Sequence, residues 1–437
     1  MSLEPSTRTL TSCKKLRGTV RVPGDKSISH RALIFGSLAT GTSEIKRIAP
    51  GKDCVSTFRC LKDLGIQLTR NSNEQDTVSI EGHGHDTMVE PDNVLNSGNS
   101  ATTMRLLCGI LAAQPFISVL NGDHSLRLRP MDRVIEPLRL MGAEIYGRQN
   151  DRFAPLTIKG NKLQGITYEL PVPSAQIKSA ILLAGLFASG KTSVLQSAIS
   201  RNHTELLLEY MGAELEKDNL VISVKQIDKP LLPFNISVPG DISSAAYWLV
   251  AGAIHPNAKI KIEGCGINPT RTGIIDVLEE MGANIKVENK QMEANEPTGD
   301  IYIESSSLKA ITIDKSILPR IIDEVPILAV AACFAEGDTI IKDATELRIK
   351  ESDRITTTVQ ELSKMGAKIE ELPDGMIIHG GTRLTGAKVR SHYDHRLAMS
   401  LTVAGLLATG KTTIHNAHVV DISYPAFWED LEHLAGE

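Results

Sequence analysis

The sequence lacks the features that mark nucleic-acid-binding, membrane and exported proteins. Basic residues are not in excess, because the formal net charge is −5 and the isoelectric point is near 6.2. Nucleic acids and membrane surfaces usually demand a basic excess, so we expect neither as a partner, and any anion site must be a local cluster. The N-terminus has no apolar signal core, and no stretch of about 18 apolar residues occurs, which predicts neither export nor a membrane span.

Cysteine is scarce and scattered. The six cysteines show none of the short paired spacings that metal sites use, so we expect no metal site. Cys108 and Cys333 lie inside apolar runs, which predicts buried, reduced thiols in a cytosolic protein.

A chain of 437 residues is too long for one ordinary core, and 41% hydrophobic with 23% charged residues is typical of a globular protein. Met-Gly-Ala follows an amphipathic segment and precedes an extended run at 141–143, 211–213, 281–283 and 365–367. Two weaker echoes, at 64–66 and 434–436, bring the copies to six. Val-Pro-Gly-Asp occurs at 22–25 and 238–241, half a chain apart, which favours two halves of three copies.

Helices and strands are expected to alternate along the chain. Apolar stretches too long for strands predict buried helices at 177–188, 245–254 and 327–335. A Gly follows the helices predicted at 177–188 and 327–335, and β-branched runs then predict strands at 192–194, 259–262 and 339–341. Amphipathic helices are predicted at 272–281 and 356–365. The predicted class is therefore α/β.

Two segments, 185–192 and 405–412, match the phosphate-loop pattern of ATPases. That loop needs a strand before it and a helix after it, so that backbone N–H groups face the phosphates. Here an apolar helix is expected before each segment and a strand after it. We therefore interpret both as turns at a helix end with a surface lysine.

Polar residues beside Lys or Arg gather at the starts of the predicted repeats. If a helix begins near Ser27, then Lys26, Ser27 and Arg31 converge on its positively polarised end and form an oxyanion cradle; an exposed helix start with ordinary charges is the alternative. Segments 96–105, 127–130 and 174–178 are weaker candidates of the same kind, with polar loops and helix caps as the alternative.

The second half of the chain carries acids among its basic residues. Asp323 and Glu324 precede a buried helix, where they could simply complement its dipole. Lys350 and Arg354 are four residues apart, so both could face one side of a helix beside Glu351, with a solvated salt-bridge face as the alternative. His395 could simply cap the last apolar helix. Together these segments suit a cleft that grips a small ligand with several negative charges.

Four motifs match a known family. Gly-Asp-Lys-Ser at 24–27, Ser-Ala-Gln-Ile-Lys at 174–178, Arg-Asn-His-Thr-Glu at 201–205 and Asn-Pro-Thr-Arg at 268–271 are similar to the four signatures of class II 5-enolpyruvylshikimate-3-phosphate synthases. The chain resembles that family over nearly its whole length.

The resemblance implies an inside-out α/β barrel of two domains, with six βαβαββ repeats, three in each domain. It places one domain at 1–21 plus 239–437 and the other at 22–238, with the active site in the cleft between them. We expect a cytoplasmic monomer that uses no cofactor or metal and has no nucleic-acid or membrane partner.

Carried over position by position, the resemblance implies two sets of substrate contacts. Phosphate and carboxylate groups need several charge-assisted donors, and Arg holds such anions bidentately. The contacts expected for shikimate 3-phosphate are Lys26, Ser27, Arg31, Ser174, Ala175, Gln176, Arg201, Asp323 and Lys350. Those expected for phosphoenolpyruvate are Lys26, Ala101, Arg129, Gln176, Arg354 and Arg396.

The implied reaction moves the enolpyruvyl group of phosphoenolpyruvate to the 5-hydroxyl of shikimate 3-phosphate by addition and then elimination, with release of phosphate. Asp323 is expected to be the base at the hydroxyl, and Glu351 the proton donor and later acceptor at the methylene carbon. Lys26 is expected to serve the phosphate leaving group and to share in proton transfer. Whether Lys26 or Asp323 is the first base stays open.

Two positions depart from better-known branches of the family. Class I members carry a Lys before an aromatic-Pro pair near the C-terminus, whereas this chain has Ile422-Ser423-Tyr424-Pro425, so the role of that Lys is unassigned. Ala101 stands where glyphosate-sensitive members have Gly. Its methyl group should crowd the longer inhibitor more than the substrate, which predicts glyphosate tolerance.

Three other interpretations remain. UDP-N-acetylglucosamine enolpyruvyl transferase shares the implied fold, but Lys26-Ser27 differs from the Lys-Asn start of that family. A repeat scaffold that only binds an anionic metabolite would leave the acids Asp323 and Glu351 without a purpose. A phosphate-loop ATPase is the third.

Overall fold

The computed structural model describes residues 6–71, 76–84 and 87–436. The chain divides into two compact units, each built from separate stretches of sequence. Unit 1 comprises Met1–Pro23, Pro239–Gln291 and Pro297–Glu437, and unit 2 comprises Gly24–Val238 with Met292–Glu296. Two of the divisions fall inside the Val-Pro-Gly-Asp motifs at 22–25 and 238–241.

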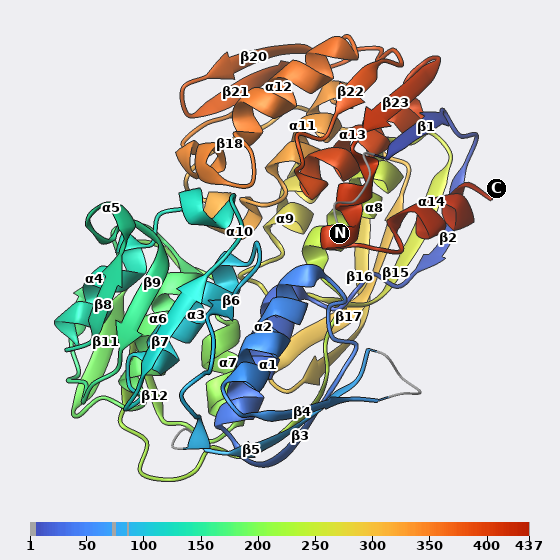
Figure 1. Ribbon diagram of the computed structural model, residues 1–437. Coiled ribbons are helices and arrows are strands. Elements are labelled where there is room, and N and C mark those ends of the chain that lie inside the picture. The colour runs from blue at the N-terminus through green and yellow to red at the C-terminus, as the bar shows by residue number, and fades with distance from the viewer. Residues whose placement is uncertain (1–5, 72–75, 85–86, 437) are drawn as a thin grey trace. The chain divides into compact units, whose positions relative to one another are not determined.

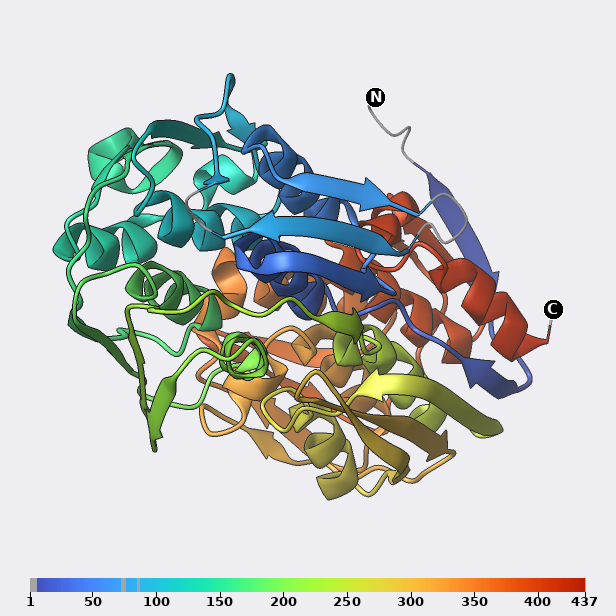
Figure 2. The ribbon, with the colours of Figure 1, turned by 90° about the horizontal axis from the view of Figure 1, so that it is seen from below.

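The described part of unit 2 forms three small four-stranded sheets, which share one pattern of pairing. Their orders are β14-β3-β5-β4, β6-β7-β9-β8 and β10-β11-β13-β12, with the first pair parallel and the others antiparallel. Figure 2 shows the blue strands β3, β5 and β4 side by side. The strands are β3 (Thr40–Lys46), β4 (Gln67–Arg70), β5 (Val78–His83), β6 (Leu95–Asn96), β7 (Ile117–Asn121), β8 (Glu144–Gly147), β9 (Phe153–Lys159), β10 (Thr167–Glu169), β11 (Lys191–Leu195), β12 (Leu215–Asp218), β13 (Val221–Lys225) and β14 (Asn235–Ser237).

Three sheets also occur in the described residues of unit 1. The order β18-β19-β21-β20 repeats the pairing pattern of unit 2, the sheet β16-β17-β15-β2 again has a parallel pair at one edge, and the third sheet has the order β1-β23-β22. The strands are β1 (Thr7–Thr11), β2 (Leu16–Val20), β15 (Ala258–Gly266), β16 (Asn284–Glu293), β17 (Glu296–Glu304), β18 (Thr312–Ile313), β19 (Asp338–Ile341), β20 (Lys368–Leu372), β21 (Gly375–His379), β22 (Lys388–Arg390) and β23 (Lys411–His415).

Helices separate the strands in both units, which confirms the predicted α/β class (Figure 1). Unit 2 contains α1 (Lys26–Leu38), α2 (Lys52–Asp63), α3 (Ala101–Leu111), η2 (Leu126–Leu128), α4 (Asp132–Leu140), α5 (Arg148–Asp151), α6 (Ala175–Gly185) and α7 (His203–Tyr210). Unit 1 contains α8 (Ile242–Ile254), α9 (Gly273–Glu280), α10 (Leu318–Ile321), α11 (Val325–Phe334), η3 (Thr345–Ile349), α12 (Arg354–Lys364), α13 (His395–Leu407), η4 (Ala417–Ile422) and α14 (Phe427–Ala435).

The apolar helices lie in the interior of their units, as predicted. In unit 1, α8, α11 and α13 contact one another, and nearly every residue of each helix is buried, because a helix that is apolar on all sides has no face suited to water. In unit 2, α3 and α6 pack closely at Gly109, where an added Cβ would lie 2.3 Å from the carbonyl oxygen of Ala180. Only Gly permits that approach.

The Met-Gly-Ala motifs end helices, as predicted. They follow α4, α7, α9 and α12 and precede β8, β12, β16 and β20. In each motif the Gly has a left-handed conformation, with φ between 87° and 105°, which a residue with a side chain rarely adopts. In the first motif the amides of Gly142 and Ala143 bond the carbonyls of Arg139 and Leu138, which satisfies the open end of the helix.

The two segments that match the phosphate-loop pattern have the wrong topology for that loop. The Gly-Lys-Thr at 190–192 follows α6 and leads into β11, and the one at 410–412 follows α13 and leads into β23. Lys191 and Lys411 are exposed. The interpretation as helix-end turns with surface lysines is confirmed.

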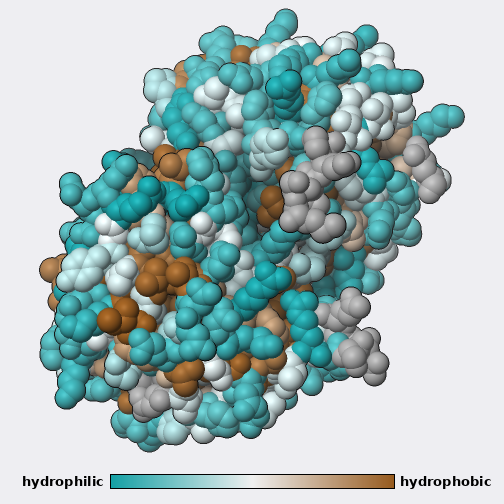
Figure 3. All heavy atoms as spheres, in the orientation of Figure 1, coloured by the Kyte–Doolittle hydropathy of each residue, from teal (hydrophilic) through white to brown (hydrophobic). Residues whose placement is uncertain are grey.

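Burial and surface character agree with the composition. Cys108 and Cys333 are buried free thiols, and burial raises the pKa of each to about 12. Hydrophilic residues cover most of the face drawn in Figure 3, and apolar residues form small patches on it. None of the helices in the described ranges has the length and apolar character needed to cross a bilayer.

The Tyr424-Pro425 segment forms part of an aromatic core in unit 1. Tyr424 is fully buried, and its ring lies edge-on to Trp248 and Phe427. Its hydroxyl accepts a hydrogen bond from Trp248 Nε1 at 2.9 Å and donates one to Asp430 at 2.5 Å. Tyr424 therefore links α8 to α14.

We expect Tyr424→Phe to destabilise unit 1 without changing its fold. The change removes one hydroxyl and leaves the buried Trp248 N–H without its acceptor, at a cost of about 1–3 kcal/mol. The thermal unfolding midpoint should fall by several degrees, as measured by calorimetry. The control is Tyr210→Phe, at a tyrosine that is 44% exposed, and this change should leave the midpoint unchanged. Equal midpoints for the two variants would show that the buried hydroxyl of Tyr424 contributes nothing to stability.

Candidate active site

In unit 1 the acidic and basic candidates meet at the start of α12. The helix begins at Arg354 because Asp353 caps it, its carboxylate accepting the amide of Thr356 at 3.1 Å. Lys350 precedes this cap and has an extended backbone. The expectation that Lys350 and Arg354 share one helix face is therefore wrong, because the cap starts the helix four residues after Lys350.

Arg354 is the centre of this cluster. Its side chain is 1% exposed and donates to Asp394 at 2.7 Å, to Glu351 at 2.6 Å and to Asp323 at 3.3 Å. Burial opposes the positive charge, but the three carboxylates outweigh burial and raise the pKa of Arg354 above its usual value. The structure thus brings together Asp323, Glu351 and Arg354.

Two further cations flank Asp323. The ammonium of Lys350 lies 3.7 Å from one carboxylate oxygen, and a guanidinium nitrogen of Arg396 lies 3.8 Å from the other. Both distances are longer than a hydrogen bond, so the attraction to Asp323 is mainly electrostatic. Burial disfavours the charge of Arg396, yet Asp323 and other neighbours raise its pKa well above the usual value.

The residue that connects these groups, Asp394, carried no predicted role. It caps α13 by accepting the amide of Arg396 at 2.9 Å, so the cap is Asp394 and not His395. Burial would raise the pKa of Asp394, but Arg354 and His395 together lower it. An Asp before an apolar helix is the usual signal for a cap, and that signal could have identified it.

In unit 2 the first candidates lie at the start of α1. Asp25 caps the helix, accepting the amide of Ile28 at 2.9 Å, and Lys26 and Ser27 form its first turn. The Lys26 ammonium pairs with Asp53 at 3.2 Å. The predicted helix start near Ser27 is confirmed to within one residue, and its N–H groups and dipole suit an anion.

Arg31 lies one turn further along α1 and is buried. Its guanidinium donates to the Ser27 carbonyl at 3.0 Å, to Thr204 at 2.8 Å and to Ser179 at 2.8 Å. Burial lowers the pKa of Arg31 to about 10. Three of the five donor hydrogens are used in these bonds, and α1, α6 and α7 are thereby linked.

A second buried pair joins two of the signature motifs. Lys178 and Glu205 are both almost fully buried, with Nζ and Oε1 2.6 Å apart. The Lys178 ammonium also donates to Gln196 at 3.1 Å and to the Ser200 carbonyl at 3.3 Å, next to Arg201. Burial, helped by Arg31 and Lys217, lowers the pKa of Lys178 although Glu205 raises it. Both residues stood inside the motifs, but nothing in the sequence indicated that they pair.

The remaining candidates of unit 2 lie at the starts of α3 and α6. Ser174 caps α6, Ala175 is its first residue, and Gln176 accepts from Arg105 at 2.6 Å and donates to Thr102 at 2.9 Å. Thr102 follows Ala101, the first residue of α3, so the structure places Gln176 near Ala101.

Arg129 and Arg201 lie outside helices. A guanidinium nitrogen of Arg129 donates to Asn99 at 3.0 Å, and Asn99 in turn donates to Asp123 at 2.8 Å. Arg201 lies two residues before α7 and is half-buried. The candidates that lie in the first turns of helices, where anions are favoured, are Lys26, Ser27, Ala101, Ala175, Gln176, Arg354 and Arg396.

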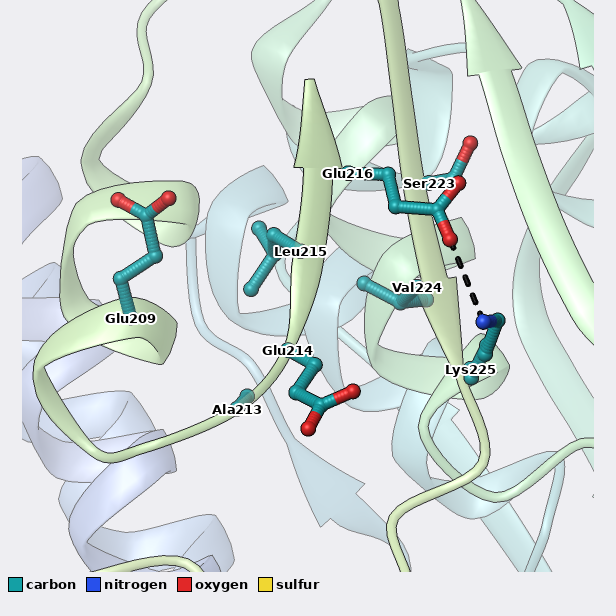
Figure 4. A pocket seen from close by; sticks show the side chains of 8 residues that line it. All are labelled: Glu209, Ala213, Glu214, Leu215, Glu216, Ser223, Val224 and Lys225. Carbon is teal, nitrogen blue, oxygen red and sulfur yellow. Dashed lines mark ion pairs between the residues drawn. The ribbon is translucent and has the colours of Figure 1, made fainter.

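A surface groove elsewhere in unit 2 does not share this character. It has a volume of about 450 Å³ and is lined by the end of α7 and by β12 and β13. Figure 4 shows the acids Glu209, Glu214 and Glu216 around it, with Glu216 paired to Lys225 at 3.3 Å. Lys191 also pairs with Glu216, and Lys217 pairs with Glu209 at 2.6 Å. None of the predicted site residues lines the groove.

Known proteins resemble the chain over nearly its full length. The family model of EPSP synthase (3-phosphoshikimate 1-carboxyvinyltransferase) matches residues 10–431. Relatives named 3-phosphoshikimate 1-carboxyvinyltransferase include one from Bacillus cereus (strain ZK / E33L), 52% identical over 96% of this chain and 97% of the relative. Another, from Herpetosiphon aurantiacus, is 50% identical over 97% of this chain and 98% of the relative.

Solved structures give the same result. An EPSP synthase from Acinetobacter baumannii superimposes with a TM-score of 0.88 at 42% identity and covers 98% of each chain. Identity and coverage at these levels extend far beyond the short motifs at the helix starts. The chain, with its acids and arginines gathered at those helix starts, therefore belongs to the EPSP synthase family of transferases.

Proposed function

We propose that the chain transfers the enolpyruvyl group of phosphoenolpyruvate to the 5-hydroxyl of shikimate 3-phosphate, a step of the shikimate pathway toward chorismate and aromatic amino acids. The observation that carries the proposal is the cluster of Asp323 and Glu351 among Lys350, Arg354 and Arg396. Two multiply charged anions can react only if cations hold them together, and proton transfer needs an acid and a base nearby.

The proposed reaction has two steps. In the addition, Asp323 accepts the proton of the 5-hydroxyl group, and the hydroxyl oxygen forms a bond to C2 of phosphoenolpyruvate. Glu351 protonates C3 at the same time, which gives a tetrahedral intermediate. In the elimination, the C2–phosphate bond breaks, C3 returns a proton to Glu351, and the enol ether remains. Lys26 neutralises the departing phosphate and shares in proton transfer. These steps need no redox cofactor.

The proposed reaction uses residues of both units. We assign Lys26, Ser27, Arg31, the Ser174–Gln176 segment, Arg201, Asp323 and Lys350 to shikimate 3-phosphate, and Lys26, Ala101, Arg129, Gln176, Arg354 and Arg396 to phosphoenolpyruvate. Each unit would consist of three βαβαββ repeats closed into an inside-out barrel, a proposal that the shared strand order of the small sheets supports.

The direct test is release of inorganic phosphate by the purified wild-type protein. We expect release to require both shikimate 3-phosphate and phosphoenolpyruvate and to need no ATP. Release with UDP-N-acetylglucosamine in place of shikimate 3-phosphate would favour the enolpyruvyl transferase of cell-wall synthesis. Binding without release would favour a scaffold protein, and release from ATP alone would favour an ATPase.

Asp323→Ala should lower kcat about a hundredfold or more, because loss of a positioned base removes that much rate. Asp323→Asn tests the same role with little change of shape, and Arg354 keeps Asp394 and Glu351 as partners in both variants. The control is Glu280→Ala on the exposed side of α9, which should retain wild-type kcat. Near-normal turnover in both Asp323 variants would remove Asp323 from the mechanism.

Ala101→Gly should make the enzyme more sensitive to glyphosate. Ala101 is the first residue of α3 and is 7% exposed, so its methyl group takes space beside Gln176. Removing one methyl from a tight pocket changes discrimination about tenfold or more. The concentration of glyphosate that halves the rate, measured at fixed phosphoenolpyruvate, should fall accordingly. Equal inhibition of wild type and variant would contradict the steric explanation.

A further inference from the structure

The turn before α13 has an unusual backbone. His392 and Tyr393 both have left-handed conformations, with φ of 51° and 59°, and neither is Gly. Two successive residues of this kind cost free energy relative to the usual conformations, so contacts around the turn must hold it in place. The turn leads directly into Asp394 and Arg396, the residues that bind Arg354 and flank Asp323.

Ser391 ties the turn to the chain at 415–416 and accepts the amide of Tyr393. Glu361, in the last turns of α12, provides the contacts on the other side. Its side chain is fully buried, and its carboxylate accepts the Arg390 amide at 3.0 Å and lies 2.6 Å from His392 Nε2. Burial would raise the pKa of Glu361, but Lys364, His392 and the Arg390 amide together lower it. The carboxylate is thus an acceptor only, and His392 Nε2 must be the donor.

The spacing of Glu361 and Arg354 explains how one helix contacts the turn on both sides. They are seven residues apart, which is about two helical turns, so they lie on the same face of α12. From that face Arg354 binds Asp394, after the turn, and Glu361 binds Arg390 and His392, before and within it. Figure 1 shows α12 in the same part of the fold as β22 and α13, which it contacts.

We infer that Glu361, through His392, is a positioning residue for Arg396 and Asp394 at the start of α13. It would not touch substrate. It fixes the turn that aims the Arg396 guanidinium, which the proposed function assigns to phosphoenolpyruvate. The inference rests on that proposed function, and the substrate it concerns is phosphoenolpyruvate rather than shikimate 3-phosphate.

The main test is Glu361→Gln, which keeps the shape of the side chain. It places an amide NH₂ group, itself a donor, beside the Arg390 amide, His392 Nε2 and the Lys364 ammonium, which are also donors. We expect the KM for phosphoenolpyruvate to rise about tenfold or more, because small displacements of a binding group have effects of that size. The KM for shikimate 3-phosphate should stay within about twofold. The control is Lys364→Gln, which removes the 47% exposed cation on the same carboxylate and should leave both constants unchanged.

Two variants of His392 separate the hydrogen bond from backbone strain. Asn tolerates the left-handed conformation well but is too short to reach Glu361, whereas Gln tolerates it less well but places its Nε2 near the position of the imidazole nitrogen. His392→Asn should therefore raise the KM for phosphoenolpyruvate, whereas His392→Gln should keep that KM close to the wild-type value. A purely structural role would give the opposite order, following thermal stability.

Three outcomes would overturn the inference: an unchanged KM for phosphoenolpyruvate in folded Glu361→Gln and His392→Asn, equal increases in both KM values, or a Lys364→Gln defect as large as that of Glu361→Gln. If Glu361→Gln does not fold, the comparison of His392→Asn with His392→Gln decides alone. Failure of the proposed function is distinct, because wild type itself would then release no phosphate from the two substrates.

Discussion

One guanidinium without access to water organises the acidic part of the candidate site. Arg354 must be neutralised inside the protein, and the groups that neutralise it come from three separate segments: the residues before α11, the residues before α12 and the start of α13. Removing one partner of a buried ion pair typically costs about 3–5 kcal/mol, so these segments are held together strongly. The carboxylates of Asp323 and Glu351 are thereby oriented before any substrate arrives, which is what a preorganised site requires.

Unit 2 uses the positive ends of helices more directly. Asp25, Ser100 and Ser174 cap α1, α3 and α6, and the residues that follow them are the ones assigned to substrate anions. Buried cations again fix the arrangement. Arg31 links α1 to α6 and α7, and the Lys178–Glu205 pair links α6 to α7, so the helix starts cannot shift independently. Both units thus combine helix dipoles, which attract anions, with buried ion pairs, which keep the helices in place.

Local patterns in the sequence predicted much of this structure. The Met-Gly-Ala motifs end helices because Gly tolerates the left-handed backbone, and the runs of small apolar residues form interior helices because they have no polar face. Composition and position made the helix starts with Lys, Ser and Arg candidate anion sites. The family resemblance implied which residues would serve which substrate, and those roles stay predictions.

The residues that were missed or misplaced depend on contacts distant in sequence. Asp394 binds Arg354 from 40 residues away, and no local pattern indicates that bond. Glu361 looks like a surface acid of an amphipathic helix, yet it is fully buried because the turn before α13 needs its carboxylate. The error at Lys350 has a different origin: the four-residue spacing suggested one helix, but Asp353 starts the helix at Arg354. Spacing alone does not show where a helix begins.

The most direct test of the proposed chemistry follows the hydrogens at C3 of phosphoenolpyruvate. In the proposed addition, Glu351 protonates that carbon, which becomes a methyl group before one proton is lost again. When the wild-type protein acts in D₂O with both substrates, deuterium should therefore enter the methylene group of the product, as detected by mass spectrometry or NMR. Phosphoenolpyruvate incubated without shikimate 3-phosphate should stay unlabelled. Product formed without deuterium would contradict an addition and elimination through a tetrahedral intermediate.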